Sequence, residues 1–139
     1  MLTHPTRRFA ITRLIKVMRF NPMTTLLIVD DNREMRQLIK SIVSQACDEV
    51  FECEDGDEVL EAFTVYRPDW ILMDVEMRRM DGLKATSNLL SSYPEAKVII
   101  VTKHTDVPMR LAASEAGARF LVGKEDLLSL LQLIQVREG

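Results

Sequence analysis

One short apolar run, Trp70–Met73, leads directly into the carboxylate of Asp74. An unbroken run of this length is typical of a strand buried on both faces, although periodicity alone leaves a short buried helix open. Pro68 before the run and Gly82 after it favour the strand. Asp74 is therefore expected where a central strand leaves the core, and in open parallel sheets ligands bind outside that end of the strands.

Further apolar runs repeat this pattern along the chain, and segments with helical periodicity separate them. Leu26–Val29, Val98–Val101 and Phe120–Val122 predict three more strands, and Glu49–Glu54 predicts a weaker strand at an edge. Strands that alternate with helices form a parallel sheet with right-handed crossovers. For one domain in a chain of 139 residues, this pattern predicts a flavodoxin-like doubly wound (βα)5 sandwich of the α/β class, with strand order 2-1-3-4-5.

The intervening helices are expected to bury one apolar face each. The first helix follows a cap at Asn32 and keeps Arg36 and Lys40 on its solvent face, and the last helix begins near Glu125. The leucines expected to point into the core from these helices include Leu38, Leu60, Leu89, Leu111, Leu127 and Leu128.

The charge of the chain is unevenly distributed. Residues 1–23 contain five of the 18 lysines and arginines and none of the 21 acids, so residues 24–139 carry 13 basic against 21 acidic side chains. This acidic domain argues against direct DNA binding. Basic residues interrupt the apolar ones in segment 1–23, which excludes a signal peptide. We expect a poorly ordered extension there, with a membrane- or partner-binding amphipathic helix and a transit-like segment as alternatives.

The two cysteines, Cys47 and Cys53, fit neither a metal-binding pair nor a CxxC redox motif. They are expected to be reduced thiols of a cytoplasmic protein, and a redox-sensing pair is the alternative. No apolar stretch of the sequence approaches the roughly 20 residues that a membrane-spanning helix needs.

Polar side chains stand at the carboxyl ends of four predicted strands. They are Asp30 with Asp31, Asp74, Thr102 and Lys124. Taken singly, an acidic pair is an ordinary helix cap and a lysine an ordinary exposed charge. The carboxyl ends of parallel strands lie at one edge of the sheet, so these side chains are expected to share a pocket. Two carboxylates about 4 Å apart repel by roughly 4 kcal/mol at an effective dielectric constant of 20, and the pocket therefore needs a cation or a proton.

The chemistry of this polar set points to phosphoryl transfer. Carboxylates with added water are the ligands that Mg²⁺ prefers, and a lysine ammonium binds phosphoryl oxygens. The pocket suits a phosphoryl group held by Mg²⁺ (or Mn²⁺), Thr102 and Lys124, with Asp74 as the nucleophile. Carboxylates are known to form aspartyl-phosphate intermediates, and phosphoryl transfer needs mainly positioning and charge neutralisation.

From about Thr24 to Val136 the chain resembles the receiver domains of two-component response regulators. The matching segments are Leu26–Asp31, Ile71–Gly82 (ILMDVEMRRMDG), Val98–Thr102 and Gly117–Lys124 (GARFLVGK). The resemblance implies a phosphoprotein of phosphorelay signal transduction that is not an enzyme. It also implies that a sensor histidine kinase or a phosphotransfer protein supplies the phosphoryl group.

The resemblance assigns a role to each member of the polar set. Asp74 corresponds to the phosphoacceptor, and Asp30 and Asp31 correspond to the metal-binding pair. Thr102 and Lys124 match the switch hydroxyl and the phosphate-binding lysine. Phosphorylation in this family changes the face formed by the fourth helix, the last strand and the last helix. That face is where a downstream partner, or a second copy of the chain in a homodimer, is expected to bind.

Several residues near the expected pocket are candidate modulators. Arg78 stands where the family usually has proline and would loosen its loop or add positive charge. Lys103 stands where a small residue is usual and would crowd the pocket or point to solvent. Leu121 replaces the usual switch aromatic, which argues against an aromatic-flip switch. Glu76 is expected to offer its backbone carbonyl to the metal, and Glu76 and His104 are candidates for controlling the access of water.

Two other functions remain as alternatives. A phosphatase of the haloacid dehalogenase type also uses an Asp nucleophile with Mg²⁺, but here the first strand ends Asp30-Asp31-Asn32 instead of D-x-D and no cap insertion follows. A phosphorylation-independent interaction module on the same fold is favoured by the departures at Arg78, Lys103 and Leu121, and the intact polar set opposes it. The chain is expected to be a stand-alone receiver, with the excised receiver of a longer regulator as the alternative.

Overall fold

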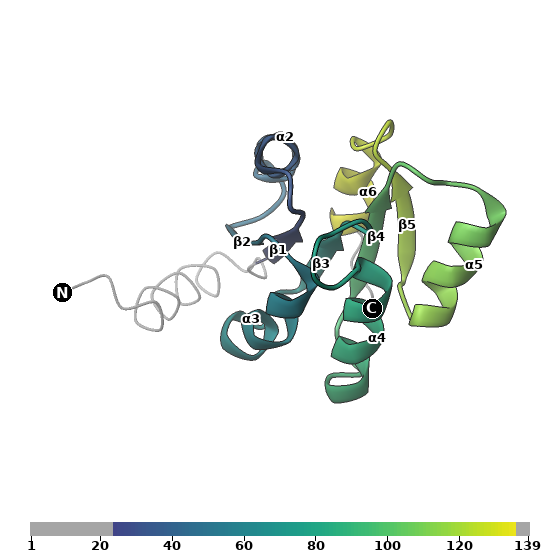
Figure 1. Ribbon diagram of the computed structural model, residues 1–139. Coiled ribbons are helices and arrows are strands. Elements are labelled where there is room, and N and C mark those ends of the chain that lie inside the picture. Colours follow the sequence, from purple (N-terminus) through teal and green to yellow (C-terminus); the bar gives the residue numbers. More distant parts are fainter. Residues whose placement is uncertain (1–23, 136–139) are drawn as a thin grey trace.

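The computed structural model describes residues 24–135, which form a five-stranded parallel sheet with helices on both faces (Figure 1). The basic extension predicted for residues 1–23 lies outside the described residues. The strand order β2-β1-β3-β4-β5 confirms the predicted flavodoxin-like arrangement. The strands are β1 (Thr25–Val29), β2 (Glu49–Cys53), β3 (Trp70–Met73), β4 (Val98–Thr102) and β5 (Phe120–Gly123). The helices are α2 (Arg33–Val43), the 3-10 turn η1 (Gly56–Glu58), α3 (Val59–Tyr66), α4 (Gly82–Ser92), α5 (Val107–Ala116) and α6 (Ser129–Gln135).

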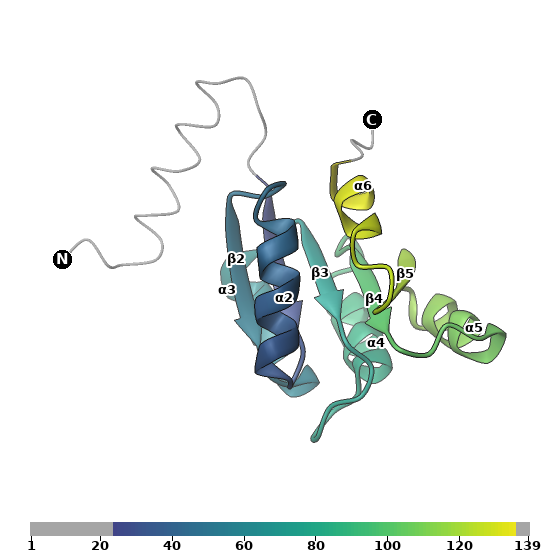
Figure 2. The ribbon, with the colours of Figure 1, turned by 90° about the horizontal axis from the view of Figure 1, so that it is seen from above.

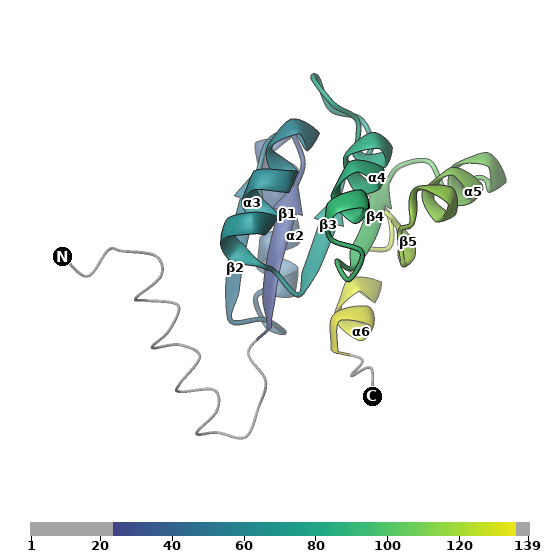
Figure 3. The ribbon, with the colours of Figure 1, turned by 90° about the horizontal axis from the view of Figure 1, so that it is seen from below.

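The helices divide into two layers around the sheet. Helices α2 and α6 cover one face (Figure 2), and α3, α4 and α5 cover the other (Figure 3). Alternate residues of each central strand enter the two layers. In β3, for example, Ile71 and Met73 pack toward α3, α4 and α5, whereas Trp70 and Leu72 pack toward α2 and α6. A strand that is buried on both faces has no solvent-facing position, and this explains the unbroken apolar runs.

Short polar caps set where the helices begin. Asn32 accepts a hydrogen bond from the backbone N–H of Met35 at the start of α2, and Asp81 and Asp106 cap α4 and α5 in the same way. Helix α5 ends at Gly117, whose φ of 100° is the left-handed conformation that glycine adopts most readily. These caps start the helices directly after the loops that carry the polar residues.

Some predictions about the helix faces are wrong. Arg36 is buried instead of solvent-facing, because its guanidinium is paired with the carbonyl of Asp30 and the carboxylate of Glu52. Helix α6 begins at Ser129 and not near Glu125, because hydrogen-bonded turns precede it, with the N–H of Asp126 donating to Gly123 and that of Ser129 to Asp126. Four of the leucines predicted to point inward are exposed instead, namely Leu38, Leu60, Leu111 and Leu128, whereas Leu89 and Leu127 are buried as predicted.

The cysteines are free thiols, as predicted. Burial, followed by the charge of Asp48, raises the pKa of Cys47 to about 11. Burial, followed by the charge of Glu58, raises the pKa of Cys53 to about 12, against a lowering effect of Arg36. Both groups are therefore protonated and weakly nucleophilic at neutral pH. Within residues 24–135, no helix has the length and apolar character needed to cross a membrane.

Candidate phosphoacceptor site

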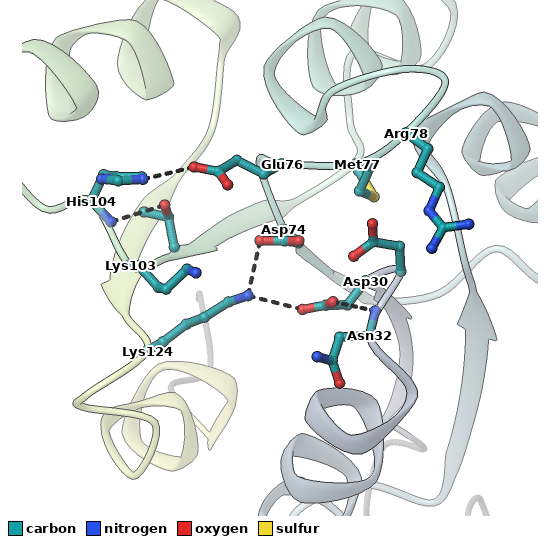
Figure 4. Close-up of a pocket in the computed structure, with 11 residues that line it drawn as sticks. Asp30, Asn32, Asp74, Glu76, Met77, Arg78, Lys103, His104 and Lys124 are labelled. Carbon is teal, nitrogen blue, oxygen red and sulfur yellow. Dashed lines mark hydrogen bonds and ion pairs between the residues drawn. The ribbon is translucent and has the colours of Figure 1, made fainter.

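The sheet brings the predicted polar set to one edge, as the strand order requires. Asp30 and Asp74 directly follow the neighbouring strands β1 and β3, and the backbone N–H of Asp74 donates a hydrogen bond to the carbonyl of Val29, the last residue of β1. Thr102 is the last residue of β4, and Lys124 follows β5. The carboxyl-terminal ends of four strands thus form one pocket, which the side chains of these residues line (Figure 4).

Three carboxylates form the acidic part of the pocket. Asp30, Asp31 and Asp74 each offer an oxygen atom, and these atoms lie within 4.8 Å of one another. Asp30 and Asp74 are buried, with 2% and 7% of their surface exposed, whereas Asp31 is exposed. Three oxygen donors with one side open to water suit a hard divalent cation such as Mg²⁺, which keeps several waters.

Lys124 bridges the two buried carboxylates (Figure 4). Its Nζ lies 3.1 Å from Oδ2 of Asp30 and 3.0 Å from Oδ1 of Asp74. Burial acts to lower the pKa of Lys124, but the hydrogen bond and charge of Asp74, together with Asp30, raise it overall. The lysine is therefore a fixed positive charge inside the pocket.

The pKa of Asp74 is raised from its ordinary value. Burial is the main cause and the charge of Asp30 is the second, and Lys124 offsets them only in part. A raised pKa of Asp74 agrees with the geometry, because the single ammonium of Lys124 is shared between two buried carboxylates. The pocket thus retains uncompensated negative charge, which a further cation would neutralise.

Hydrogen bonds fix both the side chain and the backbone carbonyl of Asp30. Its Oδ1 accepts a hydrogen bond of 2.8 Å from the backbone N–H of Asn32. Its backbone carbonyl accepts a hydrogen bond of 2.7 Å from the guanidinium of Arg36, whose Nε donates to Glu52 at 3.0 Å. Sequence reasoning missed Arg36, because a helix-face pattern treats every arginine as solvent-facing and gives no sign of its buried partners.

Thr102 lies in the wall of the pocket beside the loop that leads to α5. Its side chain is buried, and its hydroxyl oxygen accepts a hydrogen bond of 3.1 Å from the backbone N–H of His104. Its backbone carbonyl accepts a hydrogen bond from the N–H of Lys124. The hydroxyl is therefore linked to the β4–α5 loop and to the strand end that carries the lysine.

The predicted modulators lie around the pocket, with one exception. Glu76, Arg78, Lys103 and His104 all line it. His104 Nε2 lies 2.7 Å from Oε1 of Glu76, so this pair joins the β3–α4 loop to the β4–α5 loop (Figure 4). The hydrogen bond and charge of His104 lower the pKa of Glu76.

Leu121 is the exception, because it is not among the pocket-lining residues. It packs toward the layer that contains α5. Phe120 projects to the opposite face of β5, where its ring centroid lies 6.1 Å from that of Trp70. No aromatic side chain of β5 is therefore placed where the usual switch residue would stand, in agreement with the predicted alternation.

Fold and pocket together define an α/β domain with a lysine-bridged acidic site at the carboxyl ends of its parallel strands. A family model described as the response regulator receiver domain matches residues 26–135. The chain therefore belongs to the receiver-domain family of two-component response regulators, and the predicted resemblance is confirmed.

Individual relatives agree with this assignment. The chain is 37% identical over 103 residues to the chemotaxis protein CheY of Listeria monocytogenes, an alignment that covers 73% of this chain and 87% of that protein. It is 31% identical over 114 residues to the transcriptional regulatory protein DegU of Brevibacillus brevis, covering 80% of this chain. The chain spans about half of DegU, since the match covers 48% of it. The response regulator domain of Thermotoga maritima CheB superposes with a TM-score of 0.73 at 27% identity, covering 81% of this chain and 94% of that one.

Proposed function

We propose that this receiver domain accepts a phosphoryl group on Asp74 in a Mg²⁺-dependent (or Mn²⁺-dependent) reaction and thereby switches the binding of a protein partner. The observation that carries the proposal is the bridging position of Lys124 between Asp30 and Asp74. One ammonium shared by two buried carboxylates leaves negative charge for a metal ion, and it can also bind a phosphoryl oxygen.

The residues present fit a magnesium ion. Asp30, Asp31 and Asp74 would hold it with carboxylate oxygens, and the backbone carbonyl of Glu76, which lines the same pocket, would add a fourth ligand. When bound, the ion neutralises the carboxylates and the charge of the incoming phosphoryl group. The helix cap at Asn32 and the buried Arg36 keep the loop that carries the acidic pair in place before any ligand arrives.

The chain's own chemistry is a single displacement at phosphorus. An ionised oxygen of Asp74 attacks the phosphorus atom of a phosphohistidine, a P–O bond forms, and the P–N bond of the donor breaks with its electrons returning to the histidine nitrogen. Lys124 is close enough to Asp74 to stabilise the charge on the transferring oxygens. Because Asp74 is consumed in the step, the chain acts as a phosphoacceptor and not as an enzyme that turns over a separate substrate.

The switch starts from the hydroxyl of Thr102. A phosphoryl group adds between one and a half and two negative charges and three strong acceptor oxygens. Thr102 would donate a hydrogen bond to one of them, and its existing link to the N–H of His104 would draw the β4–α5 loop with it. Exposed apolar side chains next to that loop, Val107 and Leu111 on α5, would then change position relative to β5 and α6.

The proposed partners follow from this cycle. A sensor histidine kinase or a phosphotransfer protein would supply the phosphoryl group, and a downstream protein or a second copy of the chain would bind the face formed by α5, β5 and α6. We place these events in the cytoplasm and propose no direct binding of DNA by residues 24–135, whose net charge is acidic.

The test is intact-mass spectrometry after incubation with a small-molecule phosphodonor, with and without Mg²⁺. We expect one phosphoryl adduct on the wild-type chain only when Mg²⁺ is present. We expect none on Asp74→Asn, because an amide is not a nucleophile for this displacement. Lys103→Met is compared alongside, because it changes a residue of the same pocket but leaves the carboxylate nucleophile in place, and the adduct is expected to form on it.

Two results would contradict the proposed phosphorylation of Asp74. If neither a small donor nor a cognate kinase yields an adduct while Mg²⁺ still binds, the phosphoryl switch is wrong. The phosphorylation-independent interaction module would then be the better account, with Arg78 and Lys103 as the pocket residues that set this chain apart. Partner binding that is unchanged in Asp74→Asn would support the same conclusion.

The His104–Glu76 pair is predicted to lengthen the lifetime of the phosphorylated form. It joins two loops across the mouth of the pocket at 2.7 Å, where it would obstruct an attacking water. His104→Ala is expected to speed loss of the phosphoryl group a few-fold, measured as decay of the adduct mass after removal of the donor. The free energy of unfolding is expected to stay nearly constant, because both side chains are largely exposed.

A double-mutant cycle provides the control for this prediction. Glu76→Ala and the double variant should decay no faster than His104→Ala if the two side chains act as one pair. Unchanged or slower decay in His104→Ala would contradict the prediction.

A further inference from the structure

A buried carboxylate that does not line the pocket is used by neither the proposed chemistry nor the switch. Asp55 lies between β2 and η1 with 2% of its surface exposed. Its Oδ1 accepts hydrogen bonds from the backbone N–H groups of Met80 at 2.9 Å and Asp57 at 3.3 Å, and its Oδ2 accepts one from Arg79 N–H at 2.9 Å. Two of these three donors belong to the β3–α4 loop, about 25 residues further along the chain.

The carboxylate form of Asp55 is the form that this arrangement requires. Burial acts to raise its pKa, but the backbone hydrogen bonds from Arg79, Met80 and Asp57, with the charge of Arg79, lower it overall. Three backbone N–H donors favour the ionised form, because hydrogen bonds donated to a carboxylate stabilise its negative charge. The group is therefore an ionised clamp between two loops at neutral pH.

Further contacts tie the same two loops together. The guanidinium of Arg79 donates to both oxygens of Asp57, at 2.7 and 3.2 Å, and to Glu58 at 3.2 Å. Gly56 lies so close to the β3–α4 loop that a β-carbon there would come within 2.4 Å of the carbonyl oxygen of Met80. The β3–α4 loop is thus packed directly on η1, and Asp55 is the buried centre of that contact.

The β3–α4 loop, which Asp55 holds, forms the part of the pocket wall that begins at Asp74. It leaves β3 at Asp74, carries Glu76 and Arg78 into the pocket wall, and closes with a hydrogen bond of 2.8 Å from Gly82 N–H to the carbonyl of Val75. Asp55 itself does not line the pocket and is not one of the clustered metal-binding carboxylates. Its influence on the site passes through the backbone of this loop.

We infer that Asp55 is a positioning residue for the metal site, which holds the β3–α4 loop against η1 so that the backbone of Glu76 faces the acidic cluster. The inference rests on the proposed function, because it assumes that a divalent cation binds at Asp30, Asp31 and Asp74. Residues that orient metal ligands without touching the metal typically change metal affinity by about 10- to 100-fold when they are replaced.

The decisive variant is Asp55→Asn, which keeps the size of the side chain. The amide oxygen can still accept from Met80 and Asp57, but the amide NH₂ must then face the N–H of Arg79, so two donors oppose each other. We expect the Kd for Mg²⁺, measured by calorimetric titration, to rise by about tenfold. Amide hydrogen exchange should speed up in residues 75–81 without Mg²⁺, while the strands keep their protection.

A control must separate positioning from a general loss of stability. Ile134→Val shortens a buried side chain in α6, far along the chain from both loops. The denaturant concentration at the unfolding midpoint is measured for Ile134→Val and for Asp55→Asn. If Ile134→Val is less destabilised than Asp55→Asn, Ile134→Ala serves as the more strongly destabilised control. For the two Ile134 variants we expect a Kd for Mg²⁺ within about twofold of the wild-type value, because the hydrophobic layer between the sheet, α2 and α6 includes no residue of the β3–α4 loop.

The outcomes are distinct. A Kd for Mg²⁺ that is unchanged in Asp55→Asn, or that rises equally in a control variant of the same stability, would overturn the positioning role. Failure of the wild-type chain to bind Mg²⁺ would instead overturn the proposed function. In that case exchange rates in residues 75–81 would still show whether Asp55 holds the loop.

Discussion

Lys124→Met is expected to lower the free energy of unfolding by about 3 kcal/mol in the absence of divalent cations. The ammonium is the ion-pair partner of Asp30 and Asp74, whose side chains are only 2% and 8% exposed. Removing one partner of a buried ion pair leaves the other charges uncompensated, which costs more than the pair itself contributes. Methionine keeps most of the side-chain length, so packing changes little.

The pH dependence of this contribution follows from the raised pKa of Lys124. A lysine with a raised pKa in the folded state stabilises the fold fully below its ordinary pKa of 10.5 and loses that effect as the pH rises through the higher folded value. The full effect of Lys124→Met should therefore be seen at pH 7. The difference from wild type should shrink only in strongly alkaline solution.

Chemical unfolding with and without Mg²⁺ measures the effect. Mg²⁺ should stabilise Lys124→Met more than it stabilises wild type, because the ion replaces the missing positive charge. Lys103→Met is the matched control: Lys103 lines the same pocket but forms no ion pair within residues 24–135, so a change within about 0.5 kcal/mol is expected. An equal loss in both variants would show that the bridge does not stabilise the fold.

The same substitution should impair phosphorylation. A single positive group aimed at the charge of the transition state typically contributes a factor of about 100 to 1,000 in rate. The rate of adduct formation on Lys124→Met should fall by roughly that factor even at saturating Mg²⁺. The stability of the fold and the rate of phosphorylation thus both depend on the ammonium of Lys124. In Lys124→Met, Mg²⁺ is expected to restore the stability but not the rate.

The main features of the site could be predicted from sequence because they depend on strand ends alone. A buried strand is recognisable from a local run, and parallel strands deliver the next side chain to a shared edge. Asp74, Thr102 and Lys124 needed no knowledge of distant packing to be placed together. The strand order that makes β1 and β3 neighbours followed from the alternation of strands and helices.

The residues that were missed are those whose partners are far along the chain. Arg36 is buried because Glu52 on another element receives its guanidinium, and Asp55 is buried because Arg79 and Met80 supply backbone donors. A periodic pattern within one helix or one loop carries no information about such partners. Leu111 shows the converse case, since α5 contacts the core through Ala113 and leaves this leucine exposed.

Asp74→Asn is expected to raise the free energy of unfolding at pH 7 by on the order of 1 kcal/mol, while it abolishes phosphorylation. The gain comes from removing the repulsion between two buried carboxylates, and it is reduced by the loss of one contact with Lys124. Catalytic and acceptor groups are often held in such unfavourable surroundings, so that their loss stabilises the fold.

The sign of the pH dependence is fixed by the raised pKa of Asp74. A carboxyl group with a raised pKa binds its proton more tightly in the folded than in the unfolded chain, so the wild-type contribution becomes less favourable as the pH rises from the ordinary value of 3.8 through the folded value. Asn carries no charge at any of these pH values. The advantage of Asp74→Asn should therefore be complete at neutral pH and should disappear as the pH falls below the ordinary carboxyl pKa.

Urea unfolding between about pH 3 and pH 8, with a chelator present, tests this prediction, because the range extends below the ordinary carboxyl pKa of 3.8. Asp31→Asn is the control, because Asp31 belongs to the same cluster but is exposed, so a smaller gain is expected. A loss of stability in Asp74→Asn at pH 7 would mean that Lys124 compensates both carboxylates fully. It would also remove the electrostatic reason for a metal ion in the pocket. If the stability difference between Asp74→Asn and wild type disappears when Mg²⁺ is added, the repulsion between the carboxylates and the binding of the cation are linked. Mg²⁺ would then stabilise the wild-type chain, because it neutralises the repulsion that the variant lacks.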